Sequence, residues 1–376
     1  MRNQIIDNIR GLCLLGVIGI HVGSVSVQTN NFWWFTLLEI LSRYSVPTFF
    51  FISGFGLFSK DNYLQALAKG QIEQDSFNYI HFLPKRLQSA GLPYLSWSIF
   101  YQLYFWRTVG YIALAPAEQF FVLCFGLSCY HLYFMVILLV FYLTHPLWRL
   151  IMAFILKTSI PIGMSIIFIL QFILFYFSSH NHINPEGWVP FLKNLYVFRL
   201  NYVPLYYLFI YLMGGLMALY WEKVELILVK HFYPILAFYF VTILYAEGSA
   251  FYSYNYENYD LLSLAYTYHQ LSPQGLLYTI GSIWFFCAIL KSFENKSNIF
   301  TNIISLLAKY SMLIYFIHPL FLDIITRYYT NNNIVITTKK SIFTYVLLVV
   351  TSLLASYILD MIFKRLKYLR IPFCGK

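Results

Sequence analysis

Two ionisable residues, Arg10 and His21, lie eleven positions apart in the first apolar segment of the chain, DNIRGLCLLGVIGIHVGS. On a helix, eleven steps bring His21 back to within about 20° of Arg10 and place it about 16 Å further along the axis. Asp7, three residues before Arg10, is within reach of an ion pair. Ionisable side chains in such a segment usually face a cavity or a partner, so this spacing predicts a functional polar stripe of these three residues. The alternative is a neutral histidine bonded to a neighbouring helix and an arginine that only sets membrane topology.

Other polar side chains recur in apolar segments further along. Glu39 and Arg43 are four residues apart and can pair on one helix face, either for function or as a structural ion pair. His131 begins an apolar segment that reads YHLYFMVILL. His318 directly precedes Pro319, and the residue before a proline is pushed away from helical geometry. We therefore expect His318 to hydrogen-bond at a kink, with a second cavity histidine as the alternative.

The elements that must hold these residues are membrane-spanning helices. Of the 376 residues, 60% are hydrophobic and only 11% are charged, whereas about a quarter of a soluble domain is charged. Apolar runs near the roughly 20 residues needed to cross a bilayer recur along the whole chain. The sequence therefore predicts an all-α polytopic membrane protein with about ten transmembrane helices and a central cavity, the second helix being kinked at Pro47. The expected spans are residues 11–28, 36–59, 90–107, 129–150, 159–179, 201–220, 231–248, 274–291, 303–326 and 341–363, with 110–127 re-entrant or interfacial.

The basic residues give the expected orientation. If the N-terminus is cytoplasmic, most of the 25 Lys and Arg residues fall in cytoplasmic segments, and both termini lie in the cytoplasm. This asymmetry accounts for the net charge of +10 without a nucleic-acid partner. Cleavage of the first span as a signal peptide is disfavoured, because no soluble domain follows it. The sequence has no metal-ligand spacing, phosphate-cradling glycine loop or nucleotide fingerprint, so we expect no bound metal or cofactor.

Five segments, in this order, resemble the membrane-bound acyltransferase family 3. They are the arginine and histidine of the first span, VPTFFFISGFGLF, PKRLQSAGLPYLSW, YHLYFMVILLVFYLTHPL and YSMLIYFIHPLFL. The resemblance implies one acyltransferase domain over residues 1–376. It is strongest to the Gram-positive proteins that modify surface polysaccharides, including the O-succinyltransferase of intercellular adhesin synthesis. The family's second basic pair after Lys85 and Arg86 is missing here, because Leu87, Gln88 and Ser89 follow.

The resemblance also implies a reaction. An acyl group, acetyl or succinyl, would pass from cytoplasmic acyl-CoA to a hydroxyl of a surface polysaccharide or lipid-linked glycan in the bacterial plasma membrane. Acyl-CoA is then a co-substrate, and the partners are this donor, the glycan acceptor and the lipid bilayer. His21 is expected to be the general base, with Arg10 and Asp7 at the catalytic site; a covalent acyl-histidine is the alternative. The expected substrate-binding residues are Lys85, Arg86, Arg149, Glu39, Arg43, His131 and His318, of which the first three, together with Arg10, supply cations for the CoA phosphates.

Two other functions stay open. A transporter or flippase for a glycan or lipid intermediate would share the polytopic fold, although the paired repeats and broken helices typical of transporters are not evident. A non-catalytic subunit of a polysaccharide export complex is the third possibility. The expected outer loop 246–273 is dense in tyrosine and free of Lys and Arg. Its tyrosines can contact a sugar acceptor or form an aromatic belt at the membrane interface.

Overall fold

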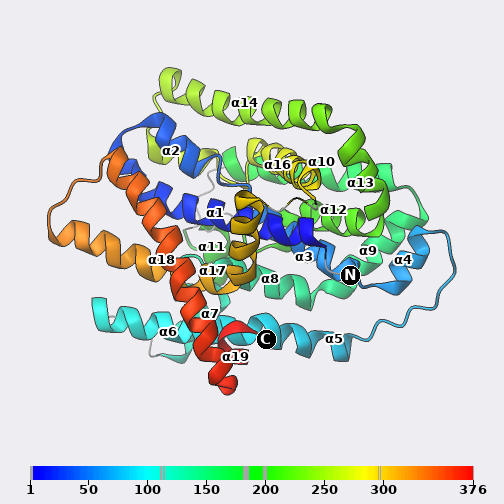
Figure 1. Cartoon of the computed structure of the whole chain (residues 1–376), viewed down its shortest axis with the longest axis horizontal. Helices are drawn as coiled ribbons and strands as arrows, with labels where there is room; N and C mark the ends of the chain where they lie inside the picture. The colour runs from blue at the N-terminus through cyan, green and yellow to red at the C-terminus, as the bar shows by residue number, and fades with distance from the viewer. Residues whose placement is uncertain are drawn as a thin grey trace. The chain divides into compact units, whose positions relative to one another are not determined.

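The computed structural model describes the whole chain except residues 1–2, 111, 113–114, 181–185, 198–200, 295, 297 and 376. Within the described residues every regular element is a helix and no strand is present, which confirms the all-α class (Figure 1). The chain forms two compact units, which are described one at a time. Unit 1 comprises Met1–Asp61, Ile160–Ile183 and Tyr207–Ala355, and unit 2 comprises Asn62–Ser159, Asn184–Tyr206 and Ser356–Lys376.

Unit 1 holds the helices that carry Asp7, Arg10, His21 and His318. They are α1 (Gln4–Ser26) with the 3₁₀ turn Val27–Thr29, α2 (Phe32–Glu39), α3 (Ser45–Phe58), α10 (Ile160–His180), α12 (Leu208–Leu219), α13 (Trp221–Lys230), α14 (Phe232–Tyr256), α15 (Leu261–Thr267), α16 (Pro273–Ser292), α17 (Ile299–Asn331) and α18 (Thr338–Arg365), whose last residues belong to unit 2.

Asparagine caps fix where α1 and α17 begin. The side chain of Asn3 accepts a hydrogen bond from the backbone N–H of Ile6 at 3.1 Å, and Asp7 in the first turn complements the helix dipole. At the start of α17, Asn298 and Thr301 form a capping box in which each side chain bonds the other residue's backbone. Both helices therefore start at sequence-encoded signals.

α1 and α17 pack side by side and run in the same direction. Gly11, near the start of α1, lies against the backbone carbonyl of Ile304. Further along both helices, the ring of His21 stacks on that of His318. The missing side chain at Gly11 is what allows the backbones to approach this closely. α17 continues as a helix through Pro319, so this proline does not end it.

Replacing Gly11 with alanine is expected to destabilise the protein by about 1–3 kcal/mol, because the new Cβ would collide with the Ile304 carbonyl and push α1 away from α17. Thermal unfolding in detergent measures the change. Gly56→Ala in α3 is the matched control, since a Cβ there meets no atom within 4 Å. It should leave Tm unchanged or raise it. Equal losses of Tm in the two variants would contradict the tight contact between the helices.

The second expected span is not one helix. α2 ends at Glu39, residues 40–44 form turns, and α3 begins at Ser45. The prediction of one continuous helix over 36–59 was therefore wrong. The break lies before Pro47, which is the third residue of α3 and fits there because the first turn of a helix does not use its N–H groups.

Unit 2 is built from shorter helices. They are α4 (Asn62–Ala68), α5 (Tyr79–Arg86) with the π-turn Leu87–Gly91, α6 (Leu92–Val109), α7 (Pro116–Cys124), α8 (Tyr133–Leu143), α9 (His145–Lys157), α11 (Pro190–Val197) and α19 (Lys367–Cys374). α8 and α9 bend by 63° at their junction, so the expected span 129–150 is a broken pair. The stretch 110–127, expected to be re-entrant or interfacial, contains only the short helix α7, and residues 111, 113 and 114 of it lie outside the described residues.

Among the described residues, six helices are long and apolar enough to cross a membrane, and seven if the bent pair counts as one span. The six are α1, α10, α14, α16, α17 and α18, and each coincides with an expected span. These helices support a multi-pass membrane protein. The number of ten spans, the cytoplasmic termini and the central cavity stay predictions. The tyrosine-rich segment 246–273 is largely helical, because α14 continues to Tyr256 and α15 follows.

Candidate active site

His21 and His318 form a stacked pair between α1 and α17. Their ring centroids are 5.1 Å apart and the planes differ by 28°. His318 is fully buried, and its Nδ1 lies 3.0 Å from the carbonyl oxygen of Ile314, to which the Nδ1–H tautomer donates. In a neutral ring this tautomer places the lone pair on Nε2. His318 thus hydrogen-bonds the carbonyl of Ile314 in its own helix and also contacts His21, while its role as a second cavity histidine stays a prediction.

Arg10 pairs with Asp7 one turn earlier on α1. Its Nη1 donates to Asp7 Oδ1 at 3.1 Å, which confirms the predicted pairing. Both side chains are partly exposed, so the pair is not locked in the protein interior. The rise of α1 separates Arg10 from His21 by about 16 Å. The pair therefore lies at one end of the helix and the histidine well along it, and the catalytic roles of all three residues stay predictions.

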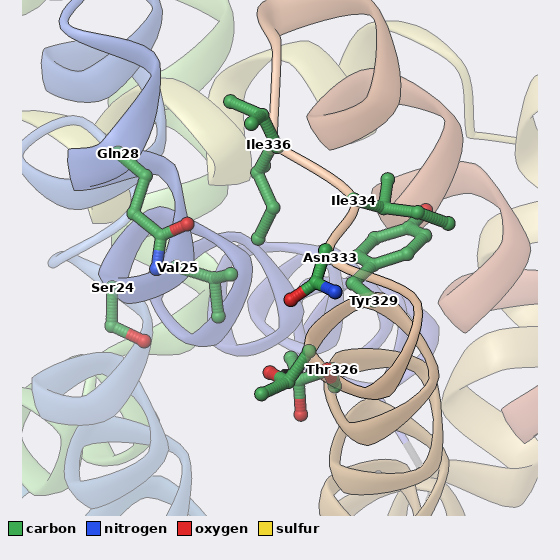
Figure 2. A pocket seen from close by; sticks show the side chains of 10 residues that line it. Ser24, Val25, Gln28, Thr326, Tyr329, Asn333, Ile334 and Ile336 are labelled. Carbon is green, nitrogen blue, oxygen red and sulfur yellow. Dashed lines mark hydrogen bonds between the residues drawn. The ribbon is translucent and has the colours of Figure 1, made fainter.

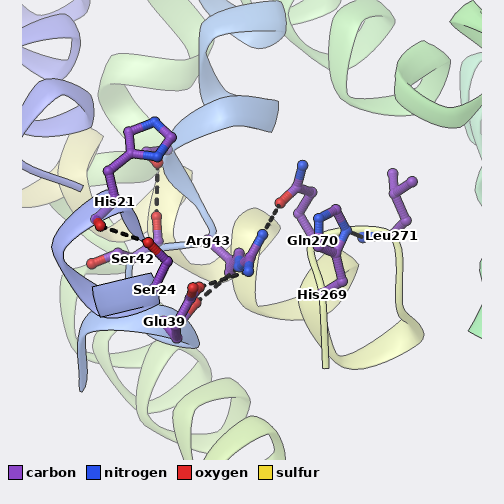
Figure 3. Close-up of polar contacts among 9 residues, drawn as sticks. His21, Ser24, Glu39, Ser42, Arg43, His269, Gln270 and Leu271 are labelled. Carbon is purple, nitrogen blue, oxygen red and sulfur yellow. Dashed lines mark hydrogen bonds and ion pairs between the residues drawn. The ribbon is translucent and has the colours of Figure 1, made fainter. Parts of the chain in front are cut away.

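Arg43 lies in the break between α2 and α3 and is held by three contacts (Figure 3). Its Nη2 is 2.6 Å from Glu39 Oε2, its Nε donates to the Glu39 carbonyl at 3.0 Å, and its Nη1 donates to Gln270 Oε1 at 3.1 Å. Glu39 and Gln270 are buried. The bond from Nε satisfies a carbonyl at the end of α2 that the broken helix leaves without its usual partner. The predicted pairing of Glu39 and Arg43 is therefore confirmed.

Two glycines of α1 bring this break close to the histidine. A Cβ on Gly19 would collide with Ser42 Oγ, and one on Gly23 would lie 2.9 Å from Glu39 Cγ. The two glycines are four residues apart and so lie on one helix face, on either side of His21 in sequence. Sequence reasoning did not use this small-residue spacing, although it was the available signal that a neighbouring segment approaches α1 here.

In unit 2, Arg149 is already engaged by a carboxylate. Its Nη1 and Nη2 donate to the two carboxylate oxygens of Asp75 at 3.2 and 2.9 Å, and its Cζ lies 4.1 Å from the centroid of the Phe77 ring. A bidentate pair that is also stacked is a strong positional restraint. In this structure Arg149 therefore holds the segment between α4 and α5, and a CoA phosphate would have to displace Asp75 to bind it.

The hydrogen bonds from Arg149 hold the pKa of Asp75 below its ordinary value. The pair therefore stabilises the segment above the unfolded pKa of about 3.9, and this contribution is lost as the pH falls through the lowered folded pKa. We expect Asp75→Asn to speed hydrogen exchange of residues 70–78 at pH 7 by about 2- to 5-fold, a small effect because Asp75 is 44% exposed. Glu73→Gln, which changes an exposed carboxylate of the same segment, is the control. An unchanged exchange rate in Asp75→Asn would show that other contacts hold the segment.

Lys85 and Arg86 end α5 beside an aromatic cluster. Lys85 is exposed, whereas Arg86 is partly buried, with its Cζ 5.3 Å from the Phe82 ring centroid and 5.9 Å from that of Tyr142. His145, the first residue of α9, is buried and stacks on Phe82 at 4.9 Å. The sequence analysis did not single out His145. Its sequence, Thr-His-Pro, was an available signal that a helix begins there, because proline favours the first turn of a helix.

His131 lies in the turn before α8 and is buried among aromatic rings. Its ring centroid is 5.5 Å from that of Tyr101 and 5.9 Å from that of Tyr130. These surroundings are typical of a core histidine, and its role in substrate binding stays a prediction.

The composition and the long apolar helices agree with a comparison of the whole chain with known families. A family model described as an acyltransferase domain matches residues 3–361. The chain belongs to acyltransferase family 3. It is therefore an acyltransferase, and its long apolar helices make it a multi-pass membrane protein. Neither the search of curated proteins nor the search of solved structures returned a match.

The candidate site of this acyltransferase is thus the His21–His318 pair with the Arg43 network beside it, all in unit 1. It contains a ring that can accept a proton, a second ring held by a backbone carbonyl, and a buried guanidinium. Within the described residues, no group of three or more His, Cys, Asp or Glu could hold a metal ion. The residues present are suited to general acid–base chemistry.

Proposed function

We propose that this acyltransferase moves an acyl group from acyl-CoA to a hydroxyl of a surface polysaccharide or lipid-linked glycan, with His21 as the general base. The observation that carries the proposal is the stacked pair of His21 and His318 inside the helices of a family 3 acyltransferase. Histidines are rare in membrane-spanning helices unless they serve a function or are fully bonded. Two histidines whose rings are in contact, from helices far apart in sequence, favour a functional role over a purely structural one.

The proposed reaction uses His21 twice. Its imidazole takes the proton of the acceptor hydroxyl while the oxygen attacks the thioester carbonyl carbon. When the tetrahedral intermediate collapses, the C–S bond breaks, the new C–O ester bond remains, and the CoA sulfur leaves with the proton that His21 had accepted. The imidazole is then neutral again, so protons and bonds balance over one turnover.

His318 and Arg43 have supporting roles in this proposal. The hydrogen bond to Ile314 fixes the His318 ring, and the stacked contact fixes His21 in turn. Two imidazolium rings at this distance would repel each other, so a neutral His318 suits a neighbour that must gain and lose one proton. We assign to Arg43 the stabilisation of the oxyanion that forms on the thioester carbonyl, because the segment that carries it packs against Gly19 and Gly23 on either side of His21.

For the donor, we assign the CoA phosphates to Lys85 and Arg86, with Arg10 as a further cation. Lys85 is exposed and Arg86 partly so, whereas Arg149 is engaged by Asp75 and is a weaker candidate than the sequence implied. The acyl group is acetyl or succinyl, and the membrane is the bacterial plasma membrane with the start of α1 on the cytoplasmic side. The parallel course of α1 and α17 supports this topology, since both would cross in the same sense.

The test is acyl transfer by the purified protein in lipid vesicles. Acyl-CoA labelled in its acyl group and a surface-glycan fraction are supplied together, and the label in the glycan is compared with the CoA thiol released. The proposal requires both products in equal amounts. Release of thiol without label in the glycan, or neither product with any acyl-CoA, would contradict it.

A transporter or flippase is the second candidate. The broken segment at residues 40–44 and the bent pair α8 and α9 favour it, because discontinuous helices often build transport sites. In the same vesicles, movement of a labelled glycan lipid across the bilayer without acyl-CoA would favour transport.

A further inference from the structure

A polar pocket of about 640 Å³ opens where α1 and α17 end in unit 1 (Figure 2). Its volume is within the range of about 300–1,000 Å³ that small-molecule sites occupy. Residues from three short stretches line it: Ser24, Val25 and Gln28; Thr326, Tyr329 and Thr330; and the segment 333–336. The pocket therefore lies between the last turns of the two helices that carry the histidine pair.

The end of α17 shapes this pocket. Asn333 has a left-handed backbone with φ of 52°, a conformation that asparagine tolerates better than most residues. The N–H of Ile334 bonds the carbonyl of Tyr329 at 2.8 Å, and that of Asn333 bonds Thr330 at 3.1 Å, as in a Schellman motif. The chain thus turns back at Asn333, and its carboxamide faces that of Gln28 across the pocket (Figure 2).

The lining is polar but uncharged. It offers the hydroxyls of Ser24, Thr326, Tyr329 and Thr330, the two carboxamides, and aliphatic surface from Val25 and the segment 333–336, and no described lining residue is ionisable apart from the tyrosine. The hydroxyls of Ser24, Thr326 and Thr330 donate to backbone carbonyls of their own helices, so they can accept from a sugar hydroxyl, whereas the carboxamides can both donate and accept.

The nearest charges on the pocket rim have partners of their own. Arg327 Nε lies 2.6 Å from Asp323 Oδ2, and Lys340 Nζ donates to the Val335 carbonyl at 2.9 Å. The lining residues themselves thus offer an anionic ligand no cation, although the ammonium group of Lys340 keeps its charge beside Val335.

The pocket is also next to the proposed base. Ser24 is one turn beyond His21, and its Oγ donates to the His21 carbonyl at 2.8 Å. The rise over these three residues is about 4.5 Å. The pocket thus begins, at Ser24, one helical turn beyond the Cα of His21 on α1.

We propose that this pocket is the acceptor subsite and that it takes an uncharged, hydroxyl-rich sugar unit. The proposal rests on the proposed function, which supplies the hydroxyl acceptor. The pocket positions the sugar by hydrogen bonds to Gln28 and Asn333, and it discriminates against uronic acids and other anionic sugars. It has no part in binding CoA, whose phosphates need cations.

The test uses an oligosaccharide of neutral hexoses and the matching uronic-acid oligosaccharide, both fluorescently labelled, with the full-length protein. Asn333→Asp keeps the size and the tolerance of the left-handed backbone but adds a negative charge. We expect it to raise the acceptor KM and the Kd of the neutral sugar about 5- to 10-fold, as for the loss of one hydrogen bond. The KM for acyl-CoA and its hydrolysis without acceptor should not change. Asn258→Asp, at another exposed left-handed asparagine outside the pocket, is the matched control and should change nothing.

A second variant tests the charge selectivity directly. Gln28→Lys adds a cation to the lining, and we expect it to bind the uronic-acid oligosaccharide at least about 5-fold more tightly than the wild type does. If both variants bind and use both sugars as the wild type does while acyl transfer is normal, the pocket is not the acceptor subsite. If the wild type transfers no acyl group, the proposed function fails, and the Kd values still decide whether the pocket binds neutral sugar.

Discussion

Replacing His21 with alanine is expected to lower acyl transfer from acyl-CoA by about 10²–10⁴-fold, the usual contribution of a general base. The physical reason is that Asp7, the other proton acceptor on this face of α1, is paired with Arg10 and lies about 21 Å away along the helix, while the proposed donor cations Lys85 and Arg86 are untouched. The KM for acyl-CoA should therefore stay near the wild-type value while kcat falls. Initial rates of label transfer in vesicles, with both substrates varied, measure the two constants separately.

His21→Gln separates chemistry from structure. Glutamine can keep a hydrogen bond to a neighbouring helix, but it cannot accept a proton at neutral pH. If His21 is the base, the glutamine variant is as inactive as alanine although its Tm is close to the wild type. If the histidine only bonds a neighbour, glutamine restores most of the activity. His231→Ala, which removes an exposed histidine, is expected to change neither rate nor Tm.

Interactions set by local helix geometry could be predicted from the sequence. The pairs Asp7–Arg10 and Glu39–Arg43 need only the three- or four-residue spacing of a helix, and both form. The second pair forms even though the helix breaks at residue 40, because the arginine side chain is long enough to reach back. Of the ten spans predicted from the long apolar runs, six coincide with described helices long and apolar enough to cross a membrane, and the ordered motifs predicted the family.

Features that depend on tertiary contacts could not be predicted. Residues 40–44, Ile-Leu-Ser-Arg-Tyr, contain neither glycine nor proline, so the local mark of the break is Pro47 in the first turn of α3, which the sequence analysis interpreted as a kink within one helix. The bonds of Arg43 to the Glu39 carbonyl and to Gln270 compensate for the lost helical bonds, and Gln270 is far away in sequence. The contact between His21 and His318 has the same origin, since helical periodicity says which face a residue is on but not which helix faces it.

The bend between α8 and α9 is a different case. Pro146 was visible in the sequence, but the hydrophobic run continues on both sides of it, and the run decided the prediction of one span over 129–150. Proline is better accommodated in the first turn of a helix than in a helix interior. The hydropathy signal is compatible with one bent span, and the proline marked the bend, which hydropathy alone did not show.

Removing Arg43 alone is expected to destabilise the protein by about 3–5 kcal/mol, because Arg43→Met leaves the carboxylate of Glu39 buried without its cation. The side chains of Arg43 and Glu39 are only 12% and 5% exposed, so water cannot replace the lost partner. The double variant Glu39→Leu/Arg43→Met removes both charges, and we expect it to recover about half or more of the loss, since apolar replacement of a whole buried pair is often neutral. Thermal unfolding of the single and double variants in the same detergent gives the coupling.

The pair of Asp323 and Arg327 on α17 is the matched control. It has the same four-residue spacing and the same 2.6 Å contact, but its side chains are 24% and 38% exposed, so Arg327→Met should cost less than about 1 kcal/mol. The acyl-transfer rates of the same Arg43 and Glu39 variants give a second measurement. If Arg43 only compensates Glu39, the double variant regains activity together with stability. If its charge stabilises the oxyanion, the double variant is stable but still loses about 10²–10³-fold in kcat. A single Arg43→Met variant as stable as the wild type would contradict the buried pair itself.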